Sequence, residues 1–143
     1  MGIILDTNVF ISAERSKRSG TLCDLIGRIQ HLAQSEALIS VITASELLMG
    51  VHRASTPRIR IRRQTFVDEI LDQFNSIPID LRVAREHSRL TASLISRGTR
   101  IGIHDSWIAA TAVAYDHAIM TANHKEFHRI EGLTVIPTRD EPI

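Results

Sequence analysis

The first ten residues, MGIILDTNVF (1–10), predict a buried strand that ends in a tight polar corner. An apolar run is followed by Asp6, Thr7 and Asn8, and apolar residues then resume. Aspartate, threonine and asparagine are favoured in turns and at helix N-caps, so one interpretation is that these residues only begin a helix. The other interpretation is that Asp6 belongs to a functional site whose remaining side chains come from distant parts of the chain.

Strands and helices are expected to alternate along the rest of the chain. Short apolar runs and apolar residues at helical spacing, interrupted by proline and glycine, indicate the boundaries. The expected strands are 38–42, residues 77 and 79 around Pro78, 118–123 and 133–137. The expected helices are 22–33, the segment after residue 42, 59–75, 80–96 with Asp80 as its cap and Gly98 as its stop, and a helix that starts near His104. Such alternation is typical of an α/β protein whose mainly parallel sheet is sandwiched between helices.

The composition is that of one ordinary domain, which we expect to cover residues 1–143. No apolar run approaches the roughly 18 residues that a membrane span needs, and Asp6 falls where a signal peptide would be apolar. Cys23 is the only cysteine, so an intrachain disulfide is excluded. We therefore expect a cytoplasmic protein with no membrane segment.

Three acidic residues occupy equivalent places in this pattern. Asp6 follows the first strand, Glu46 is expected in the first turn after the second strand, and Asp105 opens the helix before the strand at 118–123. The carboxyl ends of parallel strands and the starts of the following helices form the ligand crevice of open α/β sheets. The three carboxylates are therefore expected to meet.

Gathering three carboxylates is unfavourable unless a cation joins them. Two carboxylates about 5 Å apart repel by roughly 3 kcal/mol at an effective dielectric constant of about 20. Oxygen ligands suit a hard cation such as Mg²⁺ or Mn²⁺, which activates water and polarises a phosphoryl oxygen, so the pattern favours phosphodiester hydrolysis. The alternatives are that Glu46 closes a capping box with Thr43, and that Asp105 only complements a helix dipole.

Four segments carry a resemblance to a known family. They are LDTNVF (5–10), ITASELLMGVHRA (42–54), GIHDSWIAATAVAYD (102–116) and MTANHKEFHRIEGLTVI (120–136). In this order they resemble the segments of PIN-domain ribonucleases, and most of all the VapC toxins of type II toxin–antitoxin systems. The resemblance implies a PIN-like three-layer α/β/α sandwich and a metal-dependent RNA endonuclease that uses Mg²⁺ or Mn²⁺. It also implies a VapB-type antitoxin as inhibitor and a homodimer.

The resemblance further implies roles for individual residues. Asp6, Glu46 and Asp105 match the family's acidic metal-binding positions, and Thr7 matches the hydroxyl beside the first aspartate. Asp6 and Asp105 are expected to hold the cation, while Glu46 binds it through water or orients the nucleophile. Hydrolysis would leave a 3′-hydroxyl and a 5′-phosphate.

The family's fourth acidic position is Asn123 in this chain, and we include Asn123 among the expected catalytic residues. An amide offers an oxygen ligand but no negative charge. Thr121, Asn123 and Glu126 follow an expected strand and should reach the same rim as the acidic residues. Glu126 is therefore a candidate to supply the missing carboxylate, and the number of metal ions stays open.

An arginine-rich stretch is the expected contact for RNA phosphates, unless it is only a solvated helix face. Its members are Arg53, Arg58, Arg60, Arg62 and Arg63. The substrate would be an RNA such as tRNA or rRNA, and binding should weaken as salt rises. The helices expected at 59–75 and 80–96 are predicted to form a hairpin beside the cleft, in the region that receives the antitoxin in the family.

The remaining histidine and aromatic residues are expected to have packing or peripheral roles. We expect no zinc site among the seven histidines, and we expect only His104 to lie beside the proposed site, at its rim and without a catalytic role. Trp107 and Tyr115 are expected to pack in the core or at an interface.

Two other functions share some of these features. A haloacid-dehalogenase-like phosphatase also begins with a strand that ends in aspartate, but it needs a second aspartate two residues later, where this chain has Asn8. A non-enzymatic, Mg²⁺-binding receiver-like domain needs adjacent acidic residues after the first strand, where this chain has Thr7. Stable labelling by acetyl phosphate would indicate the receiver, and metal-dependent cutting of RNA would indicate the nuclease.

Overall fold

The computed structural model describes residues 2–15, 27 and 36–138. Its strands are β1 (Ile3–Leu5), β2 (Ala37–Ser40), β3 (Asn75–Ile77), β4 (Ala118–Thr121) and β5 (Val135–Pro137). Its helices are α1 (Thr7–Arg15), α3 (Val41–His52), α4 (Pro57–Gln73), α5 (Leu81–Ser96), α6 (Ile103–Ala114) and α7 (His124–Phe127). Apart from residue 27, which is helical, the helix expected at 22–33, with Cys23, lies outside the described residues. Of the helices described, none combines the length and the apolar character that a bilayer crossing requires.

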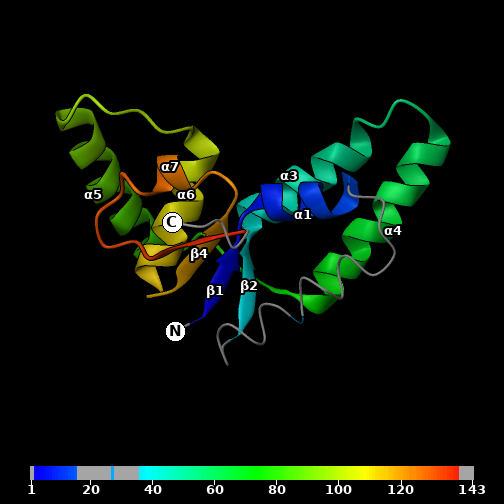
Figure 1. The fold of residues 1–143 in the computed structure, drawn as a ribbon, viewed down its shortest axis with the longest axis horizontal. Helices are drawn as coiled ribbons and strands as arrows, with labels where there is room; N and C mark the ends of the chain where they lie inside the picture. The colour runs from blue at the N-terminus through cyan, green and yellow to red at the C-terminus, as the bar shows by residue number, and fades with distance from the viewer. Residues whose placement is uncertain (1, 16–26, 28–35, 139–143) are drawn as a thin grey trace.

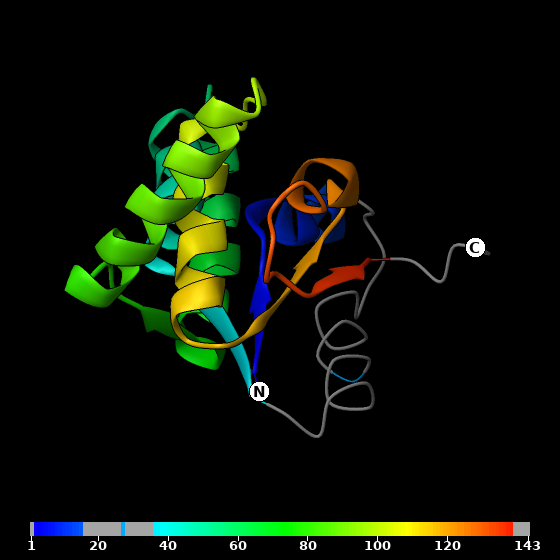
Figure 2. The same ribbon diagram turned by 90° about the vertical axis from the view of Figure 1, so that its left-hand side faces the viewer.

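The strands form one parallel sheet in the order β3-β2-β1-β4-β5. Ile4 in the central strand pairs with Leu38 of β2 on one side and with Ile119 of β4 on the other. The chain builds outward from β1 to β3 and then crosses to the other side of β1, where β4 and β5 follow (Figure 2). The strand order therefore reverses between β1 and β4, and ligands bind beyond the carboxyl ends of strands at such a point.

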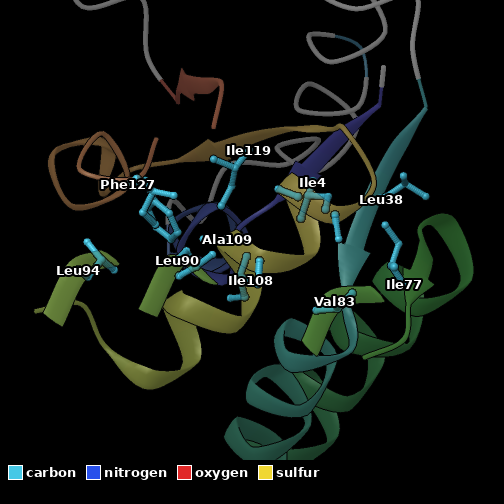
Figure 3. Close-up of a cluster of buried hydrophobic side chains, with 14 residues drawn as sticks. Ile4, Leu38, Ile77, Val83, Leu90, Leu94, Ile108, Ala109, Ile119 and Phe127 are labelled. Atoms are coloured by element: carbon cyan, nitrogen blue, oxygen red, sulfur yellow. The ribbon is translucent and has the colours of Figure 1, made fainter. Parts of the chain in front are cut away.

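Alternation of side chains along the strands divides the core in two. Ile3 and Leu5 of β1 pack with Phe10 of α1 and with side chains of α3 and α4. Ile4 faces the other way and packs with Phe127 and with side chains of α5 and α6 (Figure 3). Helices therefore cover both faces of the sheet (Figure 1), and the expected three-layer α/β/α sandwich is confirmed.

The junction between β2 and α3 comes earlier than the sequence predicts. The strand ends at Ser40 rather than at residue 42, because the Ser40 hydroxyl accepts a hydrogen bond from the Ile42 N–H (3.1 Å) and caps the helix. Glu46 therefore lies in the second turn of α3 rather than the first. Thr43 lies inside the helix, so the capping-box interpretation of Glu46 is wrong.

The connection from α4 to α5 also differs from the prediction. β3 ends at Ile77 and does not extend around Pro78, because proline has no N–H for the sheet ladder. Since β3 joins the edge of the sheet between the two helices, α4 packs against α3 on one face and α5 packs against α6 on the other. The expected hairpin of the helices at 59–75 and 80–96 is therefore wrong.

Two local signals of α5 are confirmed. Asp80 caps the helix, since its Oδ1 accepts a hydrogen bond from the Val83 N–H (3.0 Å). Gly98 has a φ of +66°, and the Thr99 N–H reaches back to the Leu94 carbonyl (2.9 Å). Glycine at this position ends the helix without the strain that a side chain would cause.

Candidate active site

Asp6 lies at the carboxyl end of β1, at the reversal point of the sheet. Its side chain is 3% exposed and accepts hydrogen bonds from the Thr7 N–H and the Thr121 hydroxyl, both at 2.8 Å. Burial raises the pKa of Asp6 despite these two bonds, and the charges of Glu46 and Glu126 raise it further. Asp6 is thus a buried carboxyl group whose ionised form is disfavoured by its surroundings.

Thr7 links Asp6 to Glu46 on α3. The Thr7 hydroxyl donates to Glu46 Oε1 (2.8 Å) and lies 3.0 Å from the Thr43 hydroxyl. Both threonines are buried, while Glu46 is partly exposed. The other Glu46 oxygen, Oε2, lies 3.5 Å from Nδ1 of His104. Contacts on both carboxylate oxygens therefore fix the orientation of Glu46.

Asp105 lies in the first turn of α6, as predicted. Burial raises the pKa of Asp105 to about 7, and the charges of Asp6, Glu126 and Glu46, with a hydrogen bond to Glu126, act in the same direction. A helix N-terminus alone favours the ionised carboxylate and would lower the pKa. Asp105 therefore does more than complement the helix dipole.

Asn123 and Glu126 form one unit at α7. The Asn123 side-chain amide donates to Glu126 Oε2 (2.8 Å), and the Asn123 backbone N–H donates to the Thr121 hydroxyl (2.9 Å). Glu126 in turn shares a hydrogen bond with Asp105. The fourth acidic side chain at this rim is therefore Glu126, which accepts a hydrogen bond from Asn123.

The structure thus brings the predicted site residues together. Asp6, Glu46 and Asp105 interact electrostatically with one another and with Glu126, and Asn123 contacts Glu126. Across residues 2–15, 27 and 36–138, however, no three or more acidic, histidine or cysteine side chains have the arrangement of a metal site. The donor set nevertheless fits a hard divalent cation, because each carboxylate offers oxygen and a cation would relieve the repulsion that, after burial, raises the pKa values of Asp6 and Asp105.

Two residues at the site were not predicted from the sequence. Thr43 contacts Thr7 and lies three residues before Glu46, so its helical spacing was the available signal. Asn8 accepts a hydrogen bond from the Ala122 N–H (3.1 Å) through Oδ1, and its Nδ2 donates to the Thr121 hydroxyl (3.3 Å). Asn8 therefore fastens α1 to the end of β4, an interaction that no sequence spacing indicates.

The neighbouring rings have the packing roles expected of them. Trp107 stacks on His87 with ring centroids 3.6 Å apart and an interplanar angle of 5°. Burial lowers the pKa of His87, whose Nε2 lies 2.9 Å from the Ser106 hydroxyl. Tyr115, directly after α6, packs against the buried cluster that includes residues of α5 and α6. His104 is exposed at the rim, as expected, although it contacts Glu46.

The sequence matches a family model described as the PIN domain over residues 3–141. The chain belongs to the PIN-domain family. It is 33% identical over 136 residues to Ribonuclease VapC1 of Rickettsia felis, a match that covers 95% of this chain and 96% of that protein. It is 28% identical over 132 residues to the tRNA(fMet)-specific endonuclease VapC of Salmonella typhimurium, with 92% of this chain and 94% of that protein covered. The resemblance to VapC ribonucleases is therefore confirmed.

Solved structures of PIN-domain proteins have the same fold. The structure of VapBC2 from Rickettsia felis bound to a DNA fragment from their promoter matches with a TM-score of 0.84 and 25% identity, over 97% of this chain and 100% of that one. The DNA-bound VapBC from Salmonella typhimurium matches with a TM-score of 0.81 and 27% identity, over 96% and 98%. Membership of the PIN-domain family excludes the phosphatase and receiver-like alternatives.

Proposed function

We propose that this chain is a metal-dependent endoribonuclease and the toxin of a toxin–antitoxin pair. The observation that carries the proposal is the convergence of Asp6, Glu46, Asp105 and Glu126 at one end of the sheet, with raised pKa values for both aspartates. These carboxylates would repel an RNA phosphate unless a cation lay between them. The relationship to VapC ribonucleases supports the same conclusion.

In this proposal Asp6 and Asp105 hold a divalent ion, and Glu46 acts on the attacking water. Bound at this site, the ion would lower the pKa of water and polarise a phosphoryl oxygen. Thr121 and the Thr7 N–H keep the Asp6 carboxylate in place. The Thr7 hydroxyl occupies Glu46 Oε1, so Oε2, which lies 3.5 Å from Nδ1 of His104, would accept the proton of the attacking water.

The fourth carboxylate in this proposal is Glu126, with Asn123 as the residue that positions it. The amide of Asn123 donates to Glu126 Oε2 (2.8 Å) and so fixes the orientation of this side chain. With oxygen donors only, the site suits Mg²⁺, and Mn²⁺ is the alternative.

The partners follow from the same family relationship. The structural relatives are VapBC complexes, so we expect a VapB-type antitoxin to neutralise this chain. A Salmonella typhimurium relative is named a tRNA(fMet)-specific endonuclease, so tRNA is a first substrate to test, with rRNA next. We further expect a homodimer that acts in the cytoplasm, where these RNAs are found.

The arginine-rich stretch around α4 has two different environments. Nη1 of Arg63 donates to the Gly50 carbonyl (2.9 Å), and its Nε lies 3.8 Å from Glu14, so Arg63 braces α4 against α3 and α1. The other four arginines, all exposed, are Arg53, Arg58, Arg60 and Arg62. Contact of these four with RNA remains a prediction.

Mapping of cut sites on total RNA tests the proposed function. The wild-type protein, freed of its antitoxin, should cut RNA in the presence of Mg²⁺ or Mn²⁺. Cleavage should stop when EDTA is added to chelate the cation. The Asp6→Asn variant removes one metal-binding charge and should lower cleavage more than about 100-fold, beyond the loss usual for a residue that only supports a ligand. Cleavage at the wild-type rate by a folded Asp6→Asn protein would refute the assignment.

A further inference from the structure

Three arginines gather beside α7, although they are far apart in the sequence. Nη2 of Arg97, at the end of α5, donates to the Arg129 carbonyl (2.9 Å). Nη1 of Arg129, just after α7, donates to the Arg100 carbonyl (3.3 Å). We call Arg97, Arg100 and Arg129 the α7 arginine cluster. Its members connect the end of α5, the loop before α6 and the turn after α7.

The cluster carries positive charge that the described residues do not neutralise. Its three side chains are exposed, and the ion pairs found among residues 2–15, 27 and 36–138 involve other arginines. Arg97 and Arg129 bond to neutral carbonyls, which use only some of the five donors of each guanidinium. Glu131 lines the same hollow as Arg97 without forming an ion pair of 4.0 Å or less with it. The guanidinium groups of Arg97 and Arg129 are thus braced on carbonyls, and all three charged side chains are exposed to an anion.

The cluster is attached to the two elements that carry half of the acidic site. Arg129 follows Glu126 by three residues, and Arg100 precedes Asp105 by five. Figure 1 shows α5, α6 and α7 together on one side of β1, whereas the connection between α3 and α4 is at the opposite end of the molecule. The exposed arginines of α4, Arg58, Arg60 and Arg62, follow that connection directly.

We infer that the α7 arginine cluster binds the phosphates of the RNA strand that neighbour the phosphate at the cleavage site. The inference rests on the proposed function. An RNA strand that binds at a site with four carboxylates needs cationic side chains close to that site. The attraction between exposed charges fades over about 8–10 Å at physiological salt. The paired N–H donors of a guanidinium match the oxygens of a phosphate. The hydrogen bonds of Arg97 and Arg129 to carbonyls also reduce the side-chain entropy that is lost on binding. The α4 arginines are then secondary contacts or none.

Binding to a fluorescein-labelled, single-stranded 20-nucleotide RNA tests the inference, with EDTA present so that no cleavage occurs. The triple variant Arg97→Gln, Arg100→Gln, Arg129→Gln should reduce the slope of log K against log salt by about 2, since each phosphate that is no longer neutralised lowers the slope by about 0.7. With Mg²⁺ and at about 0.15 M salt, its kcat/KM on RNA should fall about tenfold or more. The matched control, Arg58→Gln, Arg60→Gln, Arg62→Gln, removes the same charge from α4 and should change the salt slope and kcat/KM less than the triple variant of the α7 arginine cluster does.

Two more variants separate charge from folding. Replacing the three residues with lysine keeps the charge but removes the guanidinium hydrogen bonds of Arg97 and Arg129 to carbonyls, and should retain most of the salt slope. Arg100→Gln alone removes a side chain with no hydrogen bond or ion pair among the described residues, so it should fold normally and lower the slope by about 0.7. If the triple glutamine variant does not fold, the Arg100→Gln variant alone tests whether the cluster binds RNA phosphates.

The outcomes distinguish this inference from the proposed function. A wild-type slope in the folded triple variant, or in Arg100→Gln, overturns the inference while RNA cleavage by wild type leaves the proposed function intact. A reduced slope in the triple variant, with a wild type that cuts no RNA, supports the phosphate surface and refutes the nuclease. Loss of binding to polyglutamate with an unchanged RNA slope would assign the cluster to an acidic protein partner and overturn the inference.

Discussion

Thr7, the first residue of α1, orients the side chain of Glu46. Its hydroxyl donates to Glu46 Oε1 at 2.8 Å and lies 3.0 Å from the Thr43 hydroxyl, in a buried position. We predict that Thr7→Val lowers the cleavage rate by about 10- to 100-fold, the usual loss for a residue that orients a ligand. Thr7→Ser keeps the hydroxyl and should retain most activity. Equal rates for the valine and serine variants would show that the hydroxyl has no such role.

Asp105 makes the stability of the metal-free protein depend on pH. Its pKa is raised from 3.8 to about 7, so between these values the folded chain holds a proton that the unfolded chain has released. The free energy of unfolding should therefore fall as pH rises from about 4 to about 7, with Asp6 acting in the same direction. Urea unfolding with EDTA at a series of pH values measures this fall. Asp105→Asn should make the dependence shallower, and an unchanged curve for this variant would contradict the assignment.

At the scale of elements, local signals were predictable and tertiary contacts were not. Asp80 and Gly98 delimit α5 as predicted, because caps and left-handed glycines act within one turn. The start of α3 was missed, since the β-branched Val41 and Ile42 also suit a strand and only the Ser40 cap decides between the two.

In the candidate site, too, some residues could be predicted from the sequence, whereas the tertiary contacts could not. Asp6 and Asp105 could be placed because each follows from the position of a strand or helix. The interaction of Glu126 with Asp105 depends on how α7 packs beside α6, which no spacing in the sequence reveals. The α7 arginine cluster was likewise hidden, because its members lie up to 32 residues apart.

Gly98 allows a prediction at the scale of one helix. Its φ of +66° lies in the left-handed region, and a Cβ built there meets no atom within 4 Å. Gly98→Ala should therefore cost about 1 kcal/mol of unfolding free energy through backbone strain alone. Urea unfolding measures this, with Gly50→Ala within α3 as control, where alanine also meets no atom within 4 Å and should be neutral or stabilising. A neutral Gly98→Ala would contradict the left-handed assignment.

At the scale of the whole molecule, the parallel sheet determines where the chemistry takes place. Strand order reverses between β1 and β4, and the segments that follow β1, β2 and β4, together with the first turn of α6, carry the acidic residues of the site. The two halves of the core, one on each face, hold α1 and α3 on one side of this point and α6 on the other. Residues about 100 positions apart, such as Asp6 and Asp105, therefore act on each other.

Calorimetric titration of the protein with Mn²⁺ at pH 8, above the pKa of Asp105, tests most directly whether the carboxylates form a cation site. We predict saturable binding by the wild type and at least about 100-fold weaker binding by Asp6→Asn, a greater loss than that from a residue that only supports a ligand. Asp72→Asn, which removes an exposed carboxylate from α4, should bind like wild type. No saturable binding by the wild type, or equal affinity in Asp6→Asn, would contradict the assignment of a cation site.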